Sequence, residues 1–199
     1  RNVAEDRKRN ILMAAGMYEA GVEIDQQFEE ISARVVDLRN GQYDNAMDAE
    51  NFNEKEAADH NALVYLVGNP TAPDVVILPV EGQGLWGPMK GFLALEEDLN
   101  TVAGLGFYEH KETPGLGGEV DNPRWKGLWP GKQAFDRDGE VALEVIKGVA
   151  VRDGADFAYE VDGLSGATLT SRGVSNLVQF WIGSEGFGPF LANLKAGDA

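Results

Sequence analysis

The sequence predicts an α+β fold: one domain with a twisted, mainly antiparallel sheet and flanking helices at both ends. Two observations carry this prediction. Short apolar runs separated by glycine-rich turns fill the middle of the chain, and apolar residues at helical spacing mark both ends. No repeat and no linker divides the 199 residues, so we expect a single domain over residues 1–199.

The first 40 residues are expected to form a helical segment within that domain. Apolar residues from Ala4 to Met17 lie among charged ones and predict a first helix that stops by Gly21. A second helix, from an N-cap at Asp25 to Gly41, is predicted by four apolar residues at helical spacing: Ile24, Phe28, Ile31 and Val35.

The remainder alternates between strands and one long helix. The acidic stretch 42–61 is expected to be a surface excursion. Strands are predicted by six apolar runs: 62–67, 75–80, 89–95, 102–110, 141–151 and 157–161. Residues 168–182 predict a helix, because Val174, Leu177, Val178 and Trp181 fall on one side of it.

Composition excludes several classes of function. A formal net charge of −16 repels phosphate backbones and makes a nucleic-acid partner improbable. The absence of cysteine removes disulfides, thiol chemistry and iron–sulfur clusters, and two histidines cannot form a three-histidine metal site. No apolar run approaches the roughly 20 residues of a membrane span. The chain begins with Arg1, so we expect it to be part of a longer protein.

The most informative segment is 162–171, where four hydroxyl side chains lie among small residues at the start of the predicted helix. Small residues let a bulky ligand approach, and free amides at a helix start suit a phosphate. The alternative is that Ser165, Thr168 or Thr170 simply caps the helix. The segment also approximates the G-x-S-x-G nucleophile elbow of serine hydrolases. Ala167 replaces the second glycine and both histidines precede Ser165, which disfavours that enzyme class.

Two other loops and a pair of tryptophans are candidates for ligand contacts. In 82–91, glycines surround Trp86, which predicts either a platform for a planar ring or a tight turn with a core tryptophan. Residues 110–118 form a loop whose glycines can bring amides near a ring edge. Trp125 and Trp129 resemble a surface cover or lid, and ordinary packing is the default interpretation.

Taken in order, these segments resemble a known family. Asp162-x-x-Ser165-Gly166-Ala167-Thr168 is similar to the flavinylation motif D-x-x-S/T-G-A-T, in which the final threonine carries flavin mononucleotide (FMN) through a phosphoester bond. The segments 82–88, 112–117 and 8–12 are also similar to the family's pattern. The family is that of the covalent FMN-binding domains. The likeness is to the C subunit of sodium-translocating NADH:quinone reductase, with the G subunit of the Rnf complex as its near relative.

The resemblance implies roles for individual residues. Thr168 would be the residue esterified to FMN, with Asp162 recognised by the flavin transferase that takes FMN from FAD. Ser165, Gly166 and Ala167 would shape the approach to Thr168, and Thr170 and Ser171 would bind the phosphate or cap the helix. Lys147 would be a cation near the flavin. The isoalloxazine ring would be flanked by Leu85, Trp86, Glu112, Thr113, Gly115, Leu116 and Gly117. No catalytic residue and no metal ligand is expected.

The resemblance also implies a role for the whole chain. It would be an electron-transfer subunit of a reductase complex that pumps sodium ions, with no independent catalysis. Its partners would be the other subunits of the complex and the flavin transferase. An N-terminal membrane helix would anchor it in the inner membrane, with the flavin domain on the periplasmic side. The remaining alternative is a non-redox binding module that uses Trp86, Trp125 and Trp129.

Overall fold

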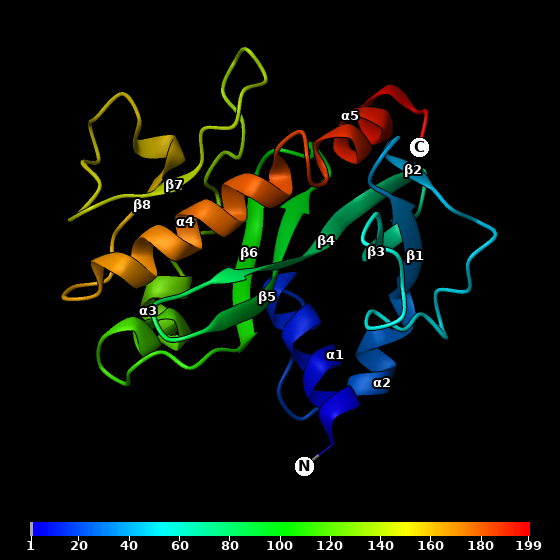
Figure 1. The fold of residues 1–199 in the computed structure, drawn as a ribbon, viewed down its shortest axis with the longest axis horizontal. Helices are drawn as coiled ribbons and strands as arrows, with labels where there is room; N and C mark the ends of the chain where they lie inside the picture. Colours follow the sequence, from blue (N-terminus) through cyan, green and yellow to red (C-terminus); the bar gives the residue numbers. More distant parts are fainter. Residues whose placement is uncertain (1) are drawn as a thin grey trace.

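Continuous apolar runs in the central strands produce a sheet with both faces buried. The computed structural model describes residues 2–199 and contains one six-stranded sheet, in which every pair of neighbours is antiparallel (Figure 1). The spatial order of its strands is β2 (Gln42–Tyr43), β1 (Ile31–Asp37), β3 (Asn61–Asn69), β4 (Ala72–Gln83), β5 (Pro88–Glu96) and β6 (Val102–Glu109).

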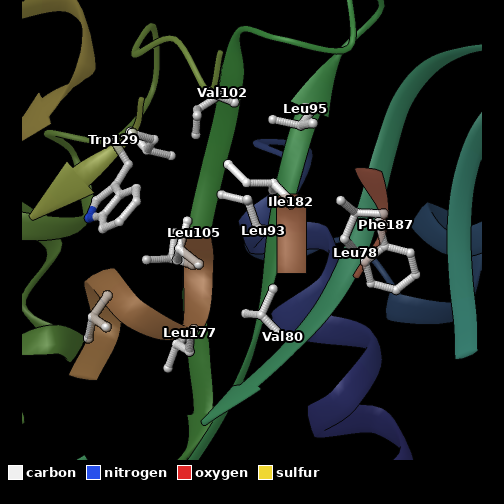
Figure 2. Packing of buried hydrophobic residues seen from close by; sticks show 14 of the residues in the cluster. Leu78, Val80, Leu93, Leu95, Val102, Leu105, Trp129, Leu177, Ile182 and Phe187 are labelled. Carbon is white, nitrogen blue, oxygen red and sulfur yellow. The ribbon is translucent and has the colours of Figure 1, made fainter. Parts of the chain in front are cut away.

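Each face of the sheet has its own core. In β4, Val76, Leu78 and Val80 point to one core, whereas Ile77 points to the other. The first core is covered by α4 (Thr168–Ile182) and α5 (Gly188–Ala196), whose buried side chains belong to it, and Figure 2 shows part of this packing. The second is covered by α1 (Val3–Ala14), which packs against β5 and β6. Helices from both ends of the chain thus sandwich one sheet, which confirms the predicted fold class.

A smaller layer of short elements lies between β6 and α4 in the chain. It consists of η2 (Gly117–Asp121), α3 (Pro123–Lys126), β7 (Glu144–Val145), η3 (Phe157–Tyr159) and β8 (Glu160–Val161). β7 and β8 pair in parallel, and β7 packs against α4. This layer frames the start of α4, where the motif 162–171 lies.

The prediction of a second helix over residues 25–41 is wrong beyond its first turn. α2 (Ile24–Gln27) and the 3-10 turn η1 (Phe28–Glu30) are followed by strand β1. β1 pairs with β3 in a register that places Ile31 opposite Val67 and Val35 opposite Leu63. Residues 31 and 35 share a face of a strand as well as a face of a helix, so their spacing does not distinguish the two.

Of the other predicted helices and strands, some are confirmed and others are much shorter than predicted. The strands predicted at 62–67, 75–80, 89–95 and 102–110 are confirmed as β3 to β6, and α4 has the predicted bounds. The runs 141–151 and 157–161 contribute only two strand residues each. Sequence reasoning missed α5, because Gly188 and Pro189 at its start resemble a turn. Across residues 2–199, no helix has the length and apolar character needed to span a membrane.

Candidate functional site

One buried carboxylate joins three segments that are distant in sequence. Glu112 Oε1 accepts hydrogen bonds from the Leu85 backbone amide at 2.7 Å and from the Thr170 hydroxyl at 2.7 Å. Glu112 Oε2 accepts from the Trp86 amide at 3.1 Å. Glu112 therefore holds together the β4–β5 turn, the loop after β6 and the first turns of α4. The sequence alone does not reveal this connection.

The hydrogen bonds to Glu112 also set its ionisation. Its side chain is only 5% exposed, and burial by itself opposes the charged form. The Thr170 hydroxyl and the amides of Leu85 and Trp86 outweigh burial and hold the pKa of Glu112 below its ordinary value. The carboxylate is therefore a charged internal anchor. The side chain expected to flank a flavin ring instead points into the protein.

Two glycines make this close assembly possible. A Cβ at Gly84 would lie 2.6 Å from Glu112 Oε1, and a Cβ at Gly117 would lie 2.5 Å from Thr170 Oγ1. Both distances are shorter than real Cβ contacts, so any side chain at either position would push the anchor apart. Both glycines fall in the segments singled out from the sequence, and the structure supplies a physical reason for their presence there.

Helix α4 begins without a side-chain cap. Its N-cap residue is Ala167, and no side chain accepts a hydrogen bond from the first amides of the helix. The alternative that Ser165, Thr168 or Thr170 caps this helix is therefore wrong. The first turn also contains no acidic residue. The free amides and the positive end of the helix dipole are left available to an anion.

The hydroxyl side chains of the motif divide into exposed and internal ones. Ser165 and Thr168 are exposed, whereas the Thr170 side chain, 1% exposed, is committed to Glu112. The Ser171 hydroxyl donates to the Ala167 carbonyl at 3.0 Å and accepts from the Leu164 amide at 2.9 Å. Thr170 and Ser171 thus shape the motif from inside, and Thr168 presents its side chain at the surface.

Four large apolar side chains are exposed around this helix start. We call them the apolar rim: Leu85 (45% exposed), Trp86 (63%), Leu116 (45%) and Leu169 (54%). Leu116 lies directly against the motif, since a Cβ at Gly166 would be 3.2 Å from Leu116 Cδ2. Exposed apolar groups gathered at one site mark a surface that binds another molecule. Thr113 and Gly115 are also exposed, in the loop that carries Leu116.

A cavity of about 420 Å³ opens beside Thr168, between α4 and β7. We call it the α4 cavity. Its wall includes Thr168, Arg172, Ser175 and Asn176 from the helix and Glu144 and Lys147 from the facing segment. Thr168 therefore borders both a polar cavity and an apolar rim.

Asp162 is held within the protein framework. Its Oδ1 accepts a hydrogen bond from the Ala150 amide at 2.8 Å, and its carbonyl accepts one from Trp125 Nε1 at 2.8 Å. Trp125 and Trp129 are both buried, with ring centroids 5.6 Å apart and Trp129 in the first core (Figure 2). The lid interpretation is therefore wrong and ordinary packing is confirmed, because both indoles pack inside the protein. Trp125 also holds Asp162, the first residue of the motif.

The structure does not support the two alternative functions, a serine hydrolase and a binding module built on tryptophans. In residues 2–199, no hydrogen bond joins Ser165 to a histidine; His110 Nε2 lies 2.7 Å from Asp121 Oδ2 instead. A serine-hydrolase triad is thus absent from that part of the chain. A ligand module built on three tryptophans also fails, since only Trp86 of the three is exposed.

The fold and the site together define an FMN-binding domain. The model of the family described as FMN-binding domain matches residues 84–183, which include the apolar rim, the anchor and α4. Among curated proteins, the C subunit of the Na(+)-translocating NADH-quinone reductase of Pseudomonas aeruginosa is 47% identical, over 98% of this chain and 84% of the relative. The same subunit of Vibrio parahaemolyticus is 40% identical with the same coverage.

Solved structures agree with this likeness. The crystal structure of Shewanella oneidensis NqrC aligns with a TM-score of 0.86 at 35% identity, covering 98% of this chain and 100% of that one. The corresponding reductase subunit from Parabacteroides distasonis aligns with a TM-score of 0.78 at 31% identity, covering 94% and 92%. The chain belongs to the NqrC family, the C subunits of the Na(+)-translocating NADH-quinone reductase. This settles the choice between the two related families raised by the sequence.

Proposed function

We propose that the chain carries FMN covalently on Thr168 and transfers electrons through it. As a member of the NqrC family, it is a flavin subunit of a sodium-translocating NADH-quinone reductase. The observation that supports Thr168 most directly is its position: an exposed hydroxyl at the uncapped start of α4. The phosphate of a flavin ester would meet free amides there.

The residues around Thr168 fit the two halves of such a cofactor. The apolar rim offers surface to a planar ring, and Trp86 offers the largest exposed face in it. The α4 cavity offers polar groups and cations to a phosphate and a polyol chain. FMN supplies the electron-carrying ring, while the protein binds it, orients it and leaves an edge accessible.

Attachment requires one group transfer. The Thr168 oxygen attacks the FMN phosphorus of FAD, so that an O–P bond forms, the phosphoanhydride bond breaks and AMP leaves with the electron pair. The hydroxyl proton passes to a base, which we assign to the flavin transferase, because the carboxylate of Glu112 is buried and already accepts three hydrogen bonds. In this proposal Asp162 keeps the motif in shape for that enzyme.

The setting of the domain is also part of the proposal. Its relatives are named as subunits of a reductase that translocates sodium ions, so this chain works with the other subunits of a membrane-associated complex. We infer an N-terminal membrane anchor before α1 and a periplasmic position for the flavin, both from the family resemblance. The exposed apolar rim is the surface through which electrons would pass to a partner.

Intact-mass measurement after co-expression with a flavin transferase tests the covalent assignment. The wild-type chain should gain the mass of FMN less one water, and Thr168→Ala should gain nothing. Ser184→Ala is the matched control, because it removes an exposed hydroxyl that lies outside the motif and should leave the added mass in place. An unmodified wild type, or a flavin retained in Thr168→Ala, would overturn the proposal.

A further inference from the structure

The α4 cavity holds two cations that the protein itself does not use. In a chain with 17 Lys and Arg residues against 33 acidic ones, a basic side chain has many possible partners. Lys8, Arg9 and Arg39, for example, form ion pairs at 2.8–3.2 Å. Across residues 2–199, Lys147 and Arg172 form no ion pair and no side-chain hydrogen bond, although both line the same cavity as Thr168.

Helix geometry aims one of these cations at the acceptor residue. Thr168, Arg172 and Asn176 follow one another at intervals of four, so they form a polar stripe along one side of α4. Val174 and Leu177, on the opposite side, are buried in the core. The stripe faces the segment that carries Lys147, across the α4 cavity.

We propose that the α4 cavity binds the phosphodiester formed on Thr168, with Arg172 as its principal cationic partner and Lys147 as the second. This inference rests on the proposed attachment to Thr168. A guanidinium one turn beyond the ester can donate two parallel hydrogen bonds to phosphate oxygens. The uncapped amides of α4 supply donors from the helix side. The wall also contains one acidic residue, Glu144. Because Lys147 and Arg172 outnumber it, the net charge of the cavity wall is positive.

The charge arrangement has a consequence for attachment as well as for the product. The transition state of phosphoryl transfer spreads negative charge over phosphate oxygens, and cations placed nearby stabilise that charge. Arg172 is exposed, so its contribution is that of a solvent-screened pair. We therefore expect a modest effect on the rate that diminishes as salt is added.

The test uses the chain together with its transferase and FAD. Arg172→Gln and Lys147→Gln should each slow FMN attachment by about two- to fivefold at low salt, and the difference should shrink toward 1 M salt. On fully loaded protein, the ³¹P resonance of the ester should shift in both variants, because the phosphate loses a neighbouring cation. Arg172→Lys should restore only part of the rate, because lysine keeps the positive charge but cannot donate two parallel hydrogen bonds.

Lys195→Gln is the matched control, since Lys195 is an exposed cation that lines a different cavity. It should leave the rate and the ³¹P resonance unchanged, and thermal unfolding should be unchanged in all four variants. If Arg172→Gln accepts FMN at the wild-type rate with the wild-type resonance, this inference is wrong while the covalent assignment stands. If the wild-type chain accepts no FMN, both fail together.

Discussion

The N-terminal region and the region around Thr168 differ in how their basic side chains are partnered. In the N-terminal region, Arg7 donates to Glu54 at 2.8 Å, and Lys8 and Arg9 pair with Asp25 and Asp6. Around Thr168, Lys147 and Arg172 line the α4 cavity and have no such partners within residues 2–199. Charges that satisfy one another stabilise a fold, whereas charges left free are available to a ligand.

Cavity size does not select the region where we propose that FMN is attached. A cavity of about 1150 Å³ lies between α1, β1 and the excursion after β2, and Arg7 and Glu54 in its wall are already paired. The α4 cavity is less than half that volume, but it lies beside an exposed hydroxyl, an uncapped helix and an apolar rim. Volume alone therefore does not select the cavity that the family motif and the uncapped helix indicate.

The largest expected effect concerns the contact between α4 and the β4–β5 hairpin. A Cβ at Gly173 would lie 2.4 Å from the Gln83 carbonyl oxygen, a backbone atom that cannot rotate away. Gly173→Ala should therefore lower the free energy of unfolding by about 2 to 3 kcal/mol, despite alanine's better helix propensity. Urea unfolding measures the loss. FMN attachment should fall as well, since α4 is displaced from the hairpin that carries Trp86.

Gly106→Ala provides the control for that substitution. Gly106 is buried in β6, yet a Cβ there would meet no atom within 4 Å. Its urea midpoint should stay near that of the wild type. Equal destabilisation of both variants would mean that the close approach at Gly173 is not what positions α4.

The second prediction concerns the internal anchor. Glu112→Gln keeps the shape of the side chain but places an amide group against donors from Leu85, Trp86 and Thr170, so one donor is left unsatisfied. We expect a loss of about 2 kcal/mol in the free energy of unfolding at pH 7. Slower FMN attachment should accompany it, because the anchor holds the apolar rim next to α4.

The pH dependence of unfolding identifies the cause. The pKa of Glu112 is lowered in the folded state from its ordinary value of 4.5, so its stabilisation is complete above about pH 4.5. That stabilisation is lost as the pH falls through the folded-state pKa. Glu112→Gln should consequently show a shallower loss of stability between pH 6 and pH 3. A parallel pair of acid profiles would contradict the anchor.

The smallest effect is expected in the N-terminal region. Glu54→Gln breaks the ion pair with Arg7, whose guanidinium keeps its hydrogen bond to the Tyr65 hydroxyl and its position over the Phe92 ring. The free energy of unfolding should fall by about 0.5 kcal/mol, and 1 M salt should remove most of the difference. FMN attachment should be unchanged. A change in attachment would break the contrast between the two regions.

The sequence predicts the secondary-structure elements and motifs better than it predicts the contacts between them. The bounds of α4 could be predicted because its apolar residues recur at helical spacing. The four central strands could be located because each contains an apolar run between turn residues, although β4 extends three residues beyond its run at each end. At residues 24–35 the spacing of the apolar residues led to a wrong prediction of one helix, because it also fits the short helix and the strand that the structure contains. For Trp125 and Trp129 the sequence left both a lid and ordinary packing open, because composition does not say on which side of a loop the core lies.

The sequence predicted which segments form the candidate site, but not the contacts that hold these segments together. The motifs placed Thr168, Trp86 and Glu112 in one family pattern, but no spacing shows that Glu112 points inward and joins the turn of Trp86 to Thr170 of α4. Arg172 was missed, although its interval of four from Thr168 was readable once α4 was predicted. What the sequence lacked was the facing wall with Lys147, which only tertiary structure brings into place.

The alanine at the start of α4 bears on how the cell handles this chain before the cofactor arrives. A helix that begins on alanine rather than a capping residue forgoes about 1 kcal/mol. An ester phosphate held there would recover that deficit, so unloaded chains would open more often than loaded ones. Proteases and chaperones act on opened chains. Attachment of FMN would then also protect the chain from degradation. The chains that persist would be enriched in molecules able to transfer electrons.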